Sequence, residues 1–370
     1  MRVLFVTSPG IGHLFPAVNT AWALRVAGHD VVVATSGHHE LVAKAGLFGV
    51  DVAPGVDFAA IFGGLLARHE GVVPGPAVAG EMFAEVSRPF LDRTVSLART
   101  WRPDLVITSM LQGAGPLAAA AIGVPVIVHG INFGHPAYMA NMVAERLAAD
   151  YARFGATARQ PAGFIDLAPP SMAFGEPAEH TISMRAVPYN AGAVVPDWVL
   201  EPRKRTRVVV TLGSVWGQLG GIAALKPFVA AAQGVDAEFV LALGGLDLSD
   251  LGELPPNLRP VDWIPLGALL ANSDAVIHHG GAGTTLTALD AGLPQYVIPQ
   301  GADQFMNADA VAHRGAGAVH RVDELDAEKL AALPGDPDLI RNAREVAAEM
   351  RTQRTPADVV PEIIALGELI

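Results

Sequence analysis

Short apolar runs rich in β-branched residues alternate with alanine-rich segments, and the whole pattern occurs twice along the chain. The first round begins with a strand at Val3–Thr7, a loop at Ser8–His13 and a helix at Ala17–Ala27 that Gly28 ends. The second begins at Arg207–Ser214, which repeats the character of the first strand. Continuously apolar strands separated by helices are typical of parallel sheets covered on both faces. The pattern predicts an α/β protein with two doubly wound, Rossmann-like domains.

The domain boundaries follow from the same pattern. We expect an N-terminal domain at 1–190, a linker at 191–206 rich in Pro, Gly and Asn, a C-terminal domain at 207–352, and a helical segment at 353–370. The other expected strands are Val31–Thr35, Leu105–Thr108, Val124–His129, Glu238–Ala242, Leu258–Val261, Ala275–His278 and Gln295–Ile298.

Composition excludes several classes of function. The formal charge is −12, so general nucleic-acid binding, which needs a basic surface, is not expected. The chain has no cysteine, which excludes disulfides and thiolate chemistry. Its longest apolar stretch, Leu117–Val128, is interrupted by Gly123 and Pro125, whereas a membrane span needs about 20 residues. We expect a cytoplasmic protein with no membrane partner.

The clearest candidate site follows the expected strand Ala275–His278. The sequence His279-Gly280-Gly281-Ala282-Gly283-Thr284-Thr285 lies between this strand and a helix expected at Leu286–Ala291. Glycines let the backbone approach a ligand, and N–H groups at a helix N-terminus bind anions. No lysine is present, so the motif is not a Walker loop. It predicts a diphosphate site that needs no metal, and a glycine-rich turn that serves packing alone is the alternative interpretation.

Two neighbouring segments add side chains that could complete a nucleotide site. Trp263 follows the expected strand Leu258–Val261 and offers a flat face on which a base can stack. Asp303 and Gln304 precede a helix expected at Met306–His313, and a carboxylate beside a carboxamide can bind two vicinal hydroxyls. Core packing for the Trp, and helix capping for the other two, are the alternative interpretations.

The first loop carries a weaker signal. Gly10-Ile11-Gly12-His13-Leu14-Phe15 has Phe15 in place of the third glycine of a dinucleotide fingerprint, and no acid follows the second strand, so NAD or FAD is not expected. His13 lies at the switch point of the predicted sheet, where a neutral imidazole could act as a general base. Capping of the turn is the alternative interpretation.

The remaining motifs do not support a metal or hydrolase site. Asp336-Pro337-Asp338 lies in a turn and is suited to capping, and the histidine pairs 38–39 and 278–279 lack a third ligand. Gly213–Gly217 does not match a nucleophile elbow.

Taken together, these motifs resemble the GT-B-fold nucleotide-sugar glycosyltransferases of the UDP-glycosyltransferase superfamily, in particular the bacterial branch that attaches deoxysugars to natural products. The motifs carrying the resemblance are Gly12–Pro16, Arg102–Val106, Val261–Leu266, His278–Thr285 and Pro299–Gln304. The resemblance covers essentially the whole chain. It implies two Rossmann-like domains facing each other across a cleft, with the acceptor held by the first domain and the donor by the second.

The resemblance also implies a role for each matching residue. His13 would be the catalytic base. Trp263 and the Ile264 backbone would bind the base of the donor, and Asp303 and Gln304 its sugar. The diphosphate would be bound by Ser214, His279, Gly281, Ala282, Gly283 and Thr284.

The chain departs from the family pattern at one position. Ser109 stands where many relatives have the carboxylate that orients the catalytic histidine. A neutral serine would stabilise an imidazolium less well, so either the acceptor is acidic or another residue helps. Asp57, His129 and His135 are candidates. Two apolar stretches, Pro54–Gly80 and Phe133–Phe154, could line a pocket for an apolar partner, and ordinary packing of long loops is the alternative interpretation. The residues expected to bind the acceptor are Phe62, Met82, Phe133, His135 and Met139.

The expected function is inverting transfer of a deoxyhexose from a pyrimidine diphosphosugar to an apolar acceptor of the aromatic polyketide or macrolide type, through oxygen or carbon. Thymidine diphosphate is favoured by the resemblance alone. The partners are small molecules, no cofactor is expected, and a homodimer is allowed. The alternatives are a non-catalytic nucleotide-sugar-binding partner protein and a transferase with a lipid acceptor.

Overall fold

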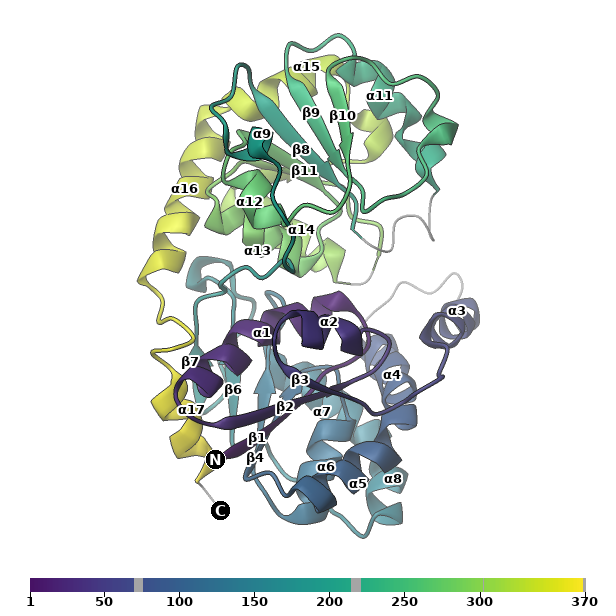
Figure 1. Cartoon of the computed structure of the whole chain (residues 1–370), viewed down its shortest axis with the longest axis vertical. Coiled ribbons are helices and arrows are strands. Elements are labelled where there is room, and N and C mark those ends of the chain that lie inside the picture. The colour runs from purple at the N-terminus through teal and green to yellow at the C-terminus, as the bar shows by residue number, and fades with distance from the viewer. Residues whose placement is uncertain (70–75, 214–220, 302, 369–370) are drawn as a thin grey trace. The chain divides into compact units, whose positions relative to one another are not determined.

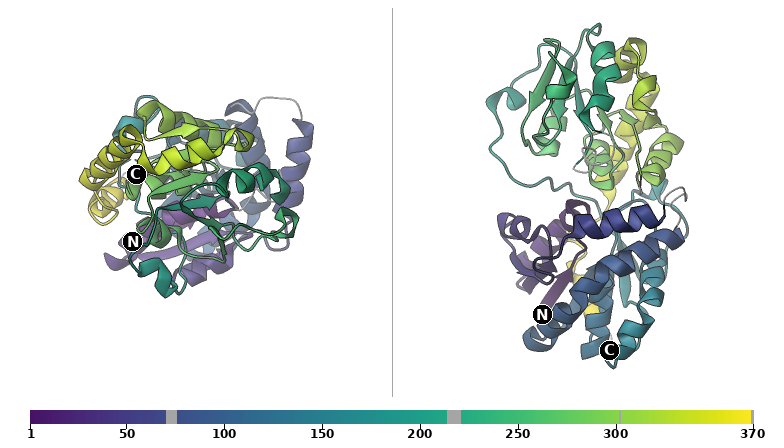
Figure 2. Two further views of the ribbon diagram at one scale, coloured as in Figure 1. Left: turned by 90° about the horizontal axis from the view of Figure 1, so that it is seen from above. Right: turned by 90° about the vertical axis from the view of Figure 1, so that its right-hand side faces the viewer.

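The computed structural model describes residues 1–69, 76–213, 221–301 and 303–368, and the chain divides into two compact units (Figure 1). Unit 1 comprises Met1–Ala168, Phe174–Val187 and Gln353–Ile370, and unit 2 comprises Pro169–Ala173 and Pro188–Thr352. Each unit contains one parallel sheet with helices packed against it, as Figures 1 and 2 show. The predicted fold class is confirmed.

The sheet of unit 1 has seven strands in the order β3-β2-β1-β4-β5-β6-β7. Strand order reverses beside β1, and this switch point is where open α/β sheets bind ligands. The strands are β1 (Arg2–Val6), β2 (Asp30–Thr35), β3 (Phe48–Asp51), β4 (Leu105–Ser109), β5 (Val126–His129), β6 (Gly163–Asp166) and β7 (Thr181–Ser183). The helices are α1 (Ile11–Val26), α2 (His39–Lys44), α3 (Phe58–Arg68), α4 (Pro76–Ser87), α5 (Leu91–Trp101), α6 (Ala114–Ile122), α7 (Pro136–Arg146), α8 (Ala148–Arg153) and α17 (Val360–Gly367).

Helix α1 begins earlier than expected. Gly10 adopts a φ of +112°, which is accessible to glycine, and the helix starts at the next residue. Gly12 and His13 therefore lie in the first turn of α1 and not in a loop. This places the imidazole of His13 at the N-terminus of α1, which follows the carboxyl end of β1 after a short loop.

Unit 2 has a six-stranded parallel sheet in the order β10-β9-β8-β11-β12-β13. Its strands are β8 (Arg207–Thr211), β9 (Glu238–Ala242), β10 (Leu258–Val261), β11 (Ala275–His278), β12 (Gln295–Val297) and β13 (Gly317–Val319). Its helices are α9 (Asp197–Leu200), α11 (Lys226–Ala232), α12 (Leu266–Leu270), α13 (Ala282–Asp290), α14 (Gln304–Arg314), α15 (Ala327–Ala332) and α16 (Pro337–Thr352).

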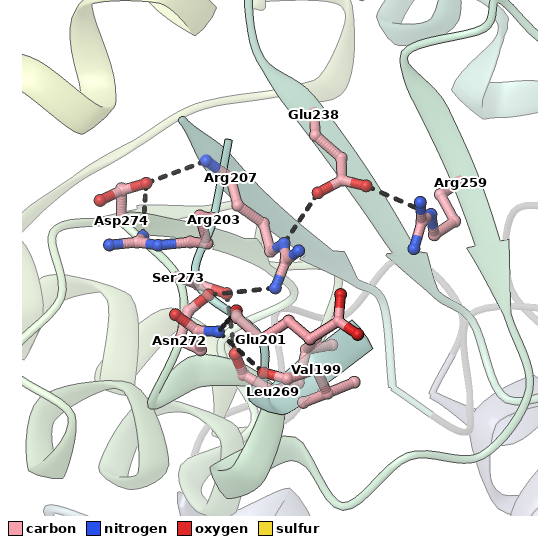
Figure 3. Close-up of polar contacts among 10 residues, drawn as sticks. All are labelled: Val199, Glu201, Arg203, Arg207, Glu238, Arg259, Leu269, Asn272, Ser273 and Asp274. Atoms are coloured by element: carbon pink, nitrogen blue, oxygen red, sulfur yellow. Dashed lines mark hydrogen bonds and ion pairs between the residues drawn. The ribbon is translucent and has the colours of Figure 1, made fainter. Parts of the chain in front are cut away.

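The segment expected to be a linker is instead packed into unit 2. Val199 of α9 is fully buried, and Nδ2 of Asn272 donates to the carbonyls of Val199 and Glu201, both at 2.8 Å (Figure 3). The sequence did not indicate this because the partners lie about 70 residues away. The expected boundary at residue 190 differs for the same reason: Pro188 already belongs to unit 2.

An ion-pair cluster at the amino ends of β8 and β9 holds this segment further. Nε of Arg207 donates to Glu238 at 2.8 Å, and Arg259 pairs with the other carboxylate oxygen of Glu238 at 3.2 Å (Figure 3). Both guanidinium groups lie over the ring of Trp198 in α9, at 5.0 and 4.5 Å. Cation–π contacts of this kind add to the packing of a short helix that could not be stable alone.

The chain returns to unit 1 after α16, as Figure 1 shows in yellow. Helix α17 buries Ile363 and Leu366, and Leu366 lies so close to Gly163 that a Cβ there would be 2.6 Å from its Cδ1. The C-terminal segment is therefore part of the core of unit 1.

Candidate functional site

The glycine-rich segment after β11 forms a tight turn into α13. Gly280 has a φ of +86°, and Gly281 is the N-cap, with no side-chain cap on the helix. The first intrahelical bond is donated by the N–H of Thr285 to the carbonyl of Gly281 at 2.9 Å. The N–H groups of Ala282, Gly283 and Thr284 thus precede the first bonded turn, and such groups bind anions. A helix N-terminus with this geometry can bind an anion.

His279 lies between two glycines. A Cβ built on Gly213 would be 2.5 Å from its ring, and one on Gly281 would be 2.3 Å from its Nε2, so both positions require glycine. Burial lowers the pKa of His279 to about 4, although the backbone of Thr211 opposes the shift. The imidazole is therefore neutral near pH 7. Its Nδ1 has no hydrogen-bond partner within the described part of the chain. Ser214, the other expected ligand here, lies outside the described residues.

Trp263 lies just beyond the carboxyl end of β10, at the same edge of the sheet as the turn after β11. Its side chain is 48% exposed, which distinguishes it from a core tryptophan and leaves a ring face for stacking. The next residue, Ile264, is partly buried and packs against the apolar cluster on one face of this sheet. That packing holds the Ile264 backbone beside the exposed ring.

Asp303 and Gln304 lie at the start of α14, near the same turn. The Asp303 side chain does not cap its helix; its Oδ2 accepts from Nδ2 of Asn307 at 3.2 Å. The side-chain oxygen of Gln304 accepts from the backbone N–H of Gln300 at 2.8 Å. The alternative interpretation, that the Asp303 side chain caps α14, is therefore wrong.

His13 and Ser109 meet in unit 1. Nδ1 of His13 lies 3.0 Å from Oγ of Ser109, the last residue of β4. The two side chains come together because β1 and β4 are neighbours in the sheet and both end at this edge. Burial lowers the pKa of His13 to about 4, so the imidazole is neutral at physiological pH.

The three other candidates for orienting His13 make hydrogen bonds to other groups. Oδ1 of Asp57 caps α3 by accepting from the N–H of Ala60 at 2.9 Å. The buried ring of His129 bonds Thr20 and the carbonyl of Gly130. Nε2 of His135 accepts from the N–H of Ala178 at 3.2 Å. Ser109 is therefore the residue that the structure places on Nδ1 of His13.

The expected acceptor-binding residues separate into two groups. Phe62 of α3 contacts Phe83 of α4, with ring centroids 6.1 Å apart, and Phe83 in turn lies 5.3 Å from the ring of His13. Met82 and Met139 are partly buried on α4 and α7, two helices that pack together. Phe133, by contrast, is 1% exposed, so it is a buried residue and offers no surface to a ligand.

His135 also differs from the expectation, because its ring packs on Phe164, a core residue. Phe83 was missed by sequence reasoning, although it is the aromatic residue that touches His13. The sequence favours its neighbour Met82, because the rotation of α4 about its axis depends on tertiary contacts that the sequence does not show. Asn307 was missed as well; its spacing of four residues from Asp303 was the available signal.

No group of three or more His, Cys, Asp or Glu side chains is arranged to hold a metal ion among the residues that the structure describes. Over the same residues, no helix has both the length and the apolar character required to cross a membrane.

Comparison with known proteins gives matches along nearly the whole chain. Two family models match: the N-terminal domain of erythromycin biosynthesis protein CIII-like proteins over residues 22–213, and their C-terminal domain over 226–366. The elloramycin glycosyltransferase ElmGT of Streptomyces olivaceus is 41% identical, with 98% of this chain and 97% of that protein covered.

Solved structures agree with these matches. The glycosyltransferase SnogD from Streptomyces nogalater is 44% identical, with a TM-score of 0.90 and 99% of both chains covered. The glycosyltransferase SsfS6 of Streptomyces sp. SF2575, complexed with thymidine diphosphate, is 32% identical, with a TM-score of 0.82 and 99% of both chains covered.

Proposed function

The chain belongs to the erythromycin biosynthesis protein CIII-like family of glycosyltransferases, and from this premise we propose that it transfers a deoxyhexose from a thymidine diphosphosugar to an apolar, aromatic polyketide or macrolide-type acceptor. The observation that carries the acceptor half of the proposal is the contact between His13 and Ser109, with Phe83 against the same imidazole. Thymidine is supported by the thymidine diphosphate in the complex of the related SsfS6.

In the proposed donor site, Trp263 stacks on the base and the turn after β11 binds the diphosphate. The N–H groups of Ala282–Thr284 and the imidazole of His279 stabilise the negative charge that develops as the nucleoside diphosphate leaves. Asp303 and Gln304 bind hydroxyls of the sugar. This arrangement meets the charge of the leaving group with N–H donors and a helix N-terminus, so we propose that no metal takes part. Turnover should then be unchanged when EDTA is added to the assay.

In the proposed acceptor site, His13 is the general base. When its Nδ1–H donates to Ser109, its Nε2 is unprotonated and can take the proton of the acceptor hydroxyl. The hydroxyl oxygen attacks the anomeric carbon as the bond to the diphosphate breaks, and this single displacement inverts the anomeric centre. A base whose pKa is about 4 is weak, which favours an acidic hydroxyl such as a phenol, with a pKa of about 10.

The test is the His13→Ala variant, assayed with a phenolic acceptor and a thymidine diphosphosugar. We expect kcat to fall by about 10²–10⁴-fold, the usual contribution of general base catalysis. The affinity for thymidine diphosphate, measured by calorimetry, should stay the same because His13 and the donor residues belong to different units. Unchanged turnover would remove His13 as the base. Failure of the wild type to bind thymidine diphosphate would overturn the donor assignment.

A further inference from the structure

In the turn before α13, the backbone N–H and the carbonyl of Gly280 are each hydrogen-bonded to a buried side chain. The N–H of Gly280 donates to Nδ1 of His278 at 3.0 Å, and its carbonyl accepts from Nδ2 of Asn307 at 2.8 Å. Both side chains have no exposed surface. They come from different elements, since His278 ends β11 and Asn307 lies in the second turn of α14.

Each side chain is itself fixed in one orientation. Since Nδ1 of His278 accepts the Gly280 proton, its Nε2 carries the ring proton and donates to Oε1 of Gln295 at 2.7 Å. Asn307 uses both amide protons, one on Gly280 and one on Oδ2 of Asp303 at 3.2 Å. Flipping this amide would place its oxygen against two other oxygens, so the hydrogen bonds determine the orientation.

The space around Gly280 leaves no room for a side chain. A Cβ at this position would lie 2.9 Å from Val297 and 3.0 Å from the carbonyl of Gln304. The turn is therefore packed between the end of β12 and the start of α14. Its direction determines where the N–H groups of Ala282–Thr284 point, because α13 begins two residues later.

We propose that His278 and Asn307 are positioning residues for sugar transfer: they hold Gly280 so that the N–H groups at the start of α13 face the diphosphate, and Asn307 joins this turn to the sugar-binding carboxylate of Asp303. This inference rests on the proposed donor site. Neither side chain needs to touch the donor. Preorganised N–H donors contribute more to binding and to leaving-group stabilisation than donors that must be oriented during the reaction.

Histidine substitutions separate the two hydrogen bonds of His278. In His278→Asn the side-chain oxygen lies near the position of Nδ1, so it can still accept from the N–H of Gly280. In His278→Gln the polar group lies near the position of Nε2, so the hydrogen bond to Gly280 is lost. We expect His278→Gln to bind thymidine diphosphate about tenfold more weakly, the loss of one buried hydrogen bond of about 1.4 kcal/mol. His278→Asn should stay within about twofold of the wild type. Equal affinities for the two variants would overturn the role of His278.

Asn307→Ala has a matched control in the same unit. Asn257 is also buried and donates to the carbonyls of Ala232, Val235 and Ala237, but it lies at the amino end of β10, the opposite edge of the sheet. We expect Asn307→Ala to weaken the binding of thymidine diphosphate and inorganic pyrophosphate about tenfold. Asn257→Ala should change only the unfolding midpoint. If both variants bind these ligands as the wild type does, the proposal for Asn307 is wrong.

The two probes separate this inference from the proposed function. A wild type that binds pyrophosphate but not thymidine diphosphate would contradict the proposed donor, while the same variants still test the positioning role through pyrophosphate. A wild type that binds neither would contradict both proposals. In steady-state assays with a thymidine diphosphosugar, the positioning role predicts a raised donor KM for Asn307→Ala and an unchanged KM for Asn257→Ala.

Discussion

At the scale of single residues, the proposed base His13 and its partner Ser109 would determine which acceptors the enzyme can use. A carboxylate on Nδ1 would stabilise an imidazolium, whereas the Ser109 hydroxyl is neutral. Burial disfavours the charged ring as well, which is why the pKa of His13 falls to about 4. The enzyme should therefore retain an active base at acidic pH but lack the basicity to deprotonate a weakly acidic alcohol.

Ser109→Asp should reverse this balance. The new carboxylate would favour the imidazolium and raise the pKa of His13, so the acidic limb of the profile of kcat/KM against pH should move to higher pH. Turnover of aliphatic hydroxyl acceptors should rise relative to phenolic ones. Ser109→Ala, which removes the hydrogen bond without adding charge, is the control. An acidic limb at the same pH in Ser109→Asp and wild type would contradict this account.

Much of the candidate donor site could be predicted from the sequence, because its chemistry is local. The motif at 279–285 lies between a strand and a helix, and its glycines are adjacent to the histidine they surround. Phe83 and Asn307 could not be found this way. The contact of Phe83 with His13 depends on how α4 packs, and the partner of Asn307 is a carbonyl 27 residues away.

At the scale of elements, the anchoring of α9 depends on a buried charge. Arg207 is 5% exposed and Glu238 is 9% exposed, and Glu238 bonds both Arg207 and Arg259. Removing one partner from a buried ion pair leaves a desolvated charge, which costs about 3–5 kcal/mol. We expect Glu238→Gln to lower the free energy of unfolding of unit 2 by about 3 kcal/mol, measured by urea denaturation with hydrogen exchange at β8 and β9.

A solvent-exposed ion pair provides the control for that experiment. Arg341 and Asp338 are paired on the surface of α16, three residues apart, and such pairs contribute less than about 1 kcal/mol. Asp338→Asn should therefore leave the urea midpoint nearly unchanged. A similar, small effect of both substitutions would show that the Glu238 cluster does not stabilise α9.

Element boundaries were predicted less well than element types. The central strands were recognised because they are continuously apolar and β-branched, but α1 and α13 begin several residues before the expected positions. In both cases the helix starts within a glycine-containing motif whose low helix propensity indicated a loop. The short strands β3, β6, β7 and β13 were missed because three or four residues carry too little pattern, and Gly49, Gly163 and Gly317 weaken it.

At the scale of the whole molecule, each unit contains two histidines whose pKa burial lowers to about 4 or below: His13 and His129 in unit 1, and His278 and His279 in unit 2. Burial lowers the pKa of His129 in unit 1 to about 4 and that of His278 in unit 2 to about 3. In the unfolded chain all four would bind a proton below about pH 6.5. The unfolded state therefore takes up more protons below that pH, and the free energy of unfolding falls as pH decreases from 6.5 towards 4.

We expect the thermal unfolding midpoint to be constant above pH 7 and to drop between pH 6.5 and 4.5. Each histidine contributes a slope of at most about 1.4 kcal/mol per pH unit. His129→Gln should reduce the slope, while replacement of the exposed His313 should not. The same slope in His129→Gln and wild type would contradict the assignment.

The path of the chain has a consequence for synthesis on the ribosome and for recombination. Most of unit 1 is translated before unit 2, yet its core includes Ile363 and Leu366 of α17, which are made after the whole of unit 2. Co-translational folding can complete unit 2 before unit 1 closes its own core. A hybrid that exchanges unit 2 for that of a relative must therefore rejoin the recipient's own sequence after Thr352. A single crossover near residue 188 would give unit 1 a foreign last helix, whose side chains have not coevolved with Gly163.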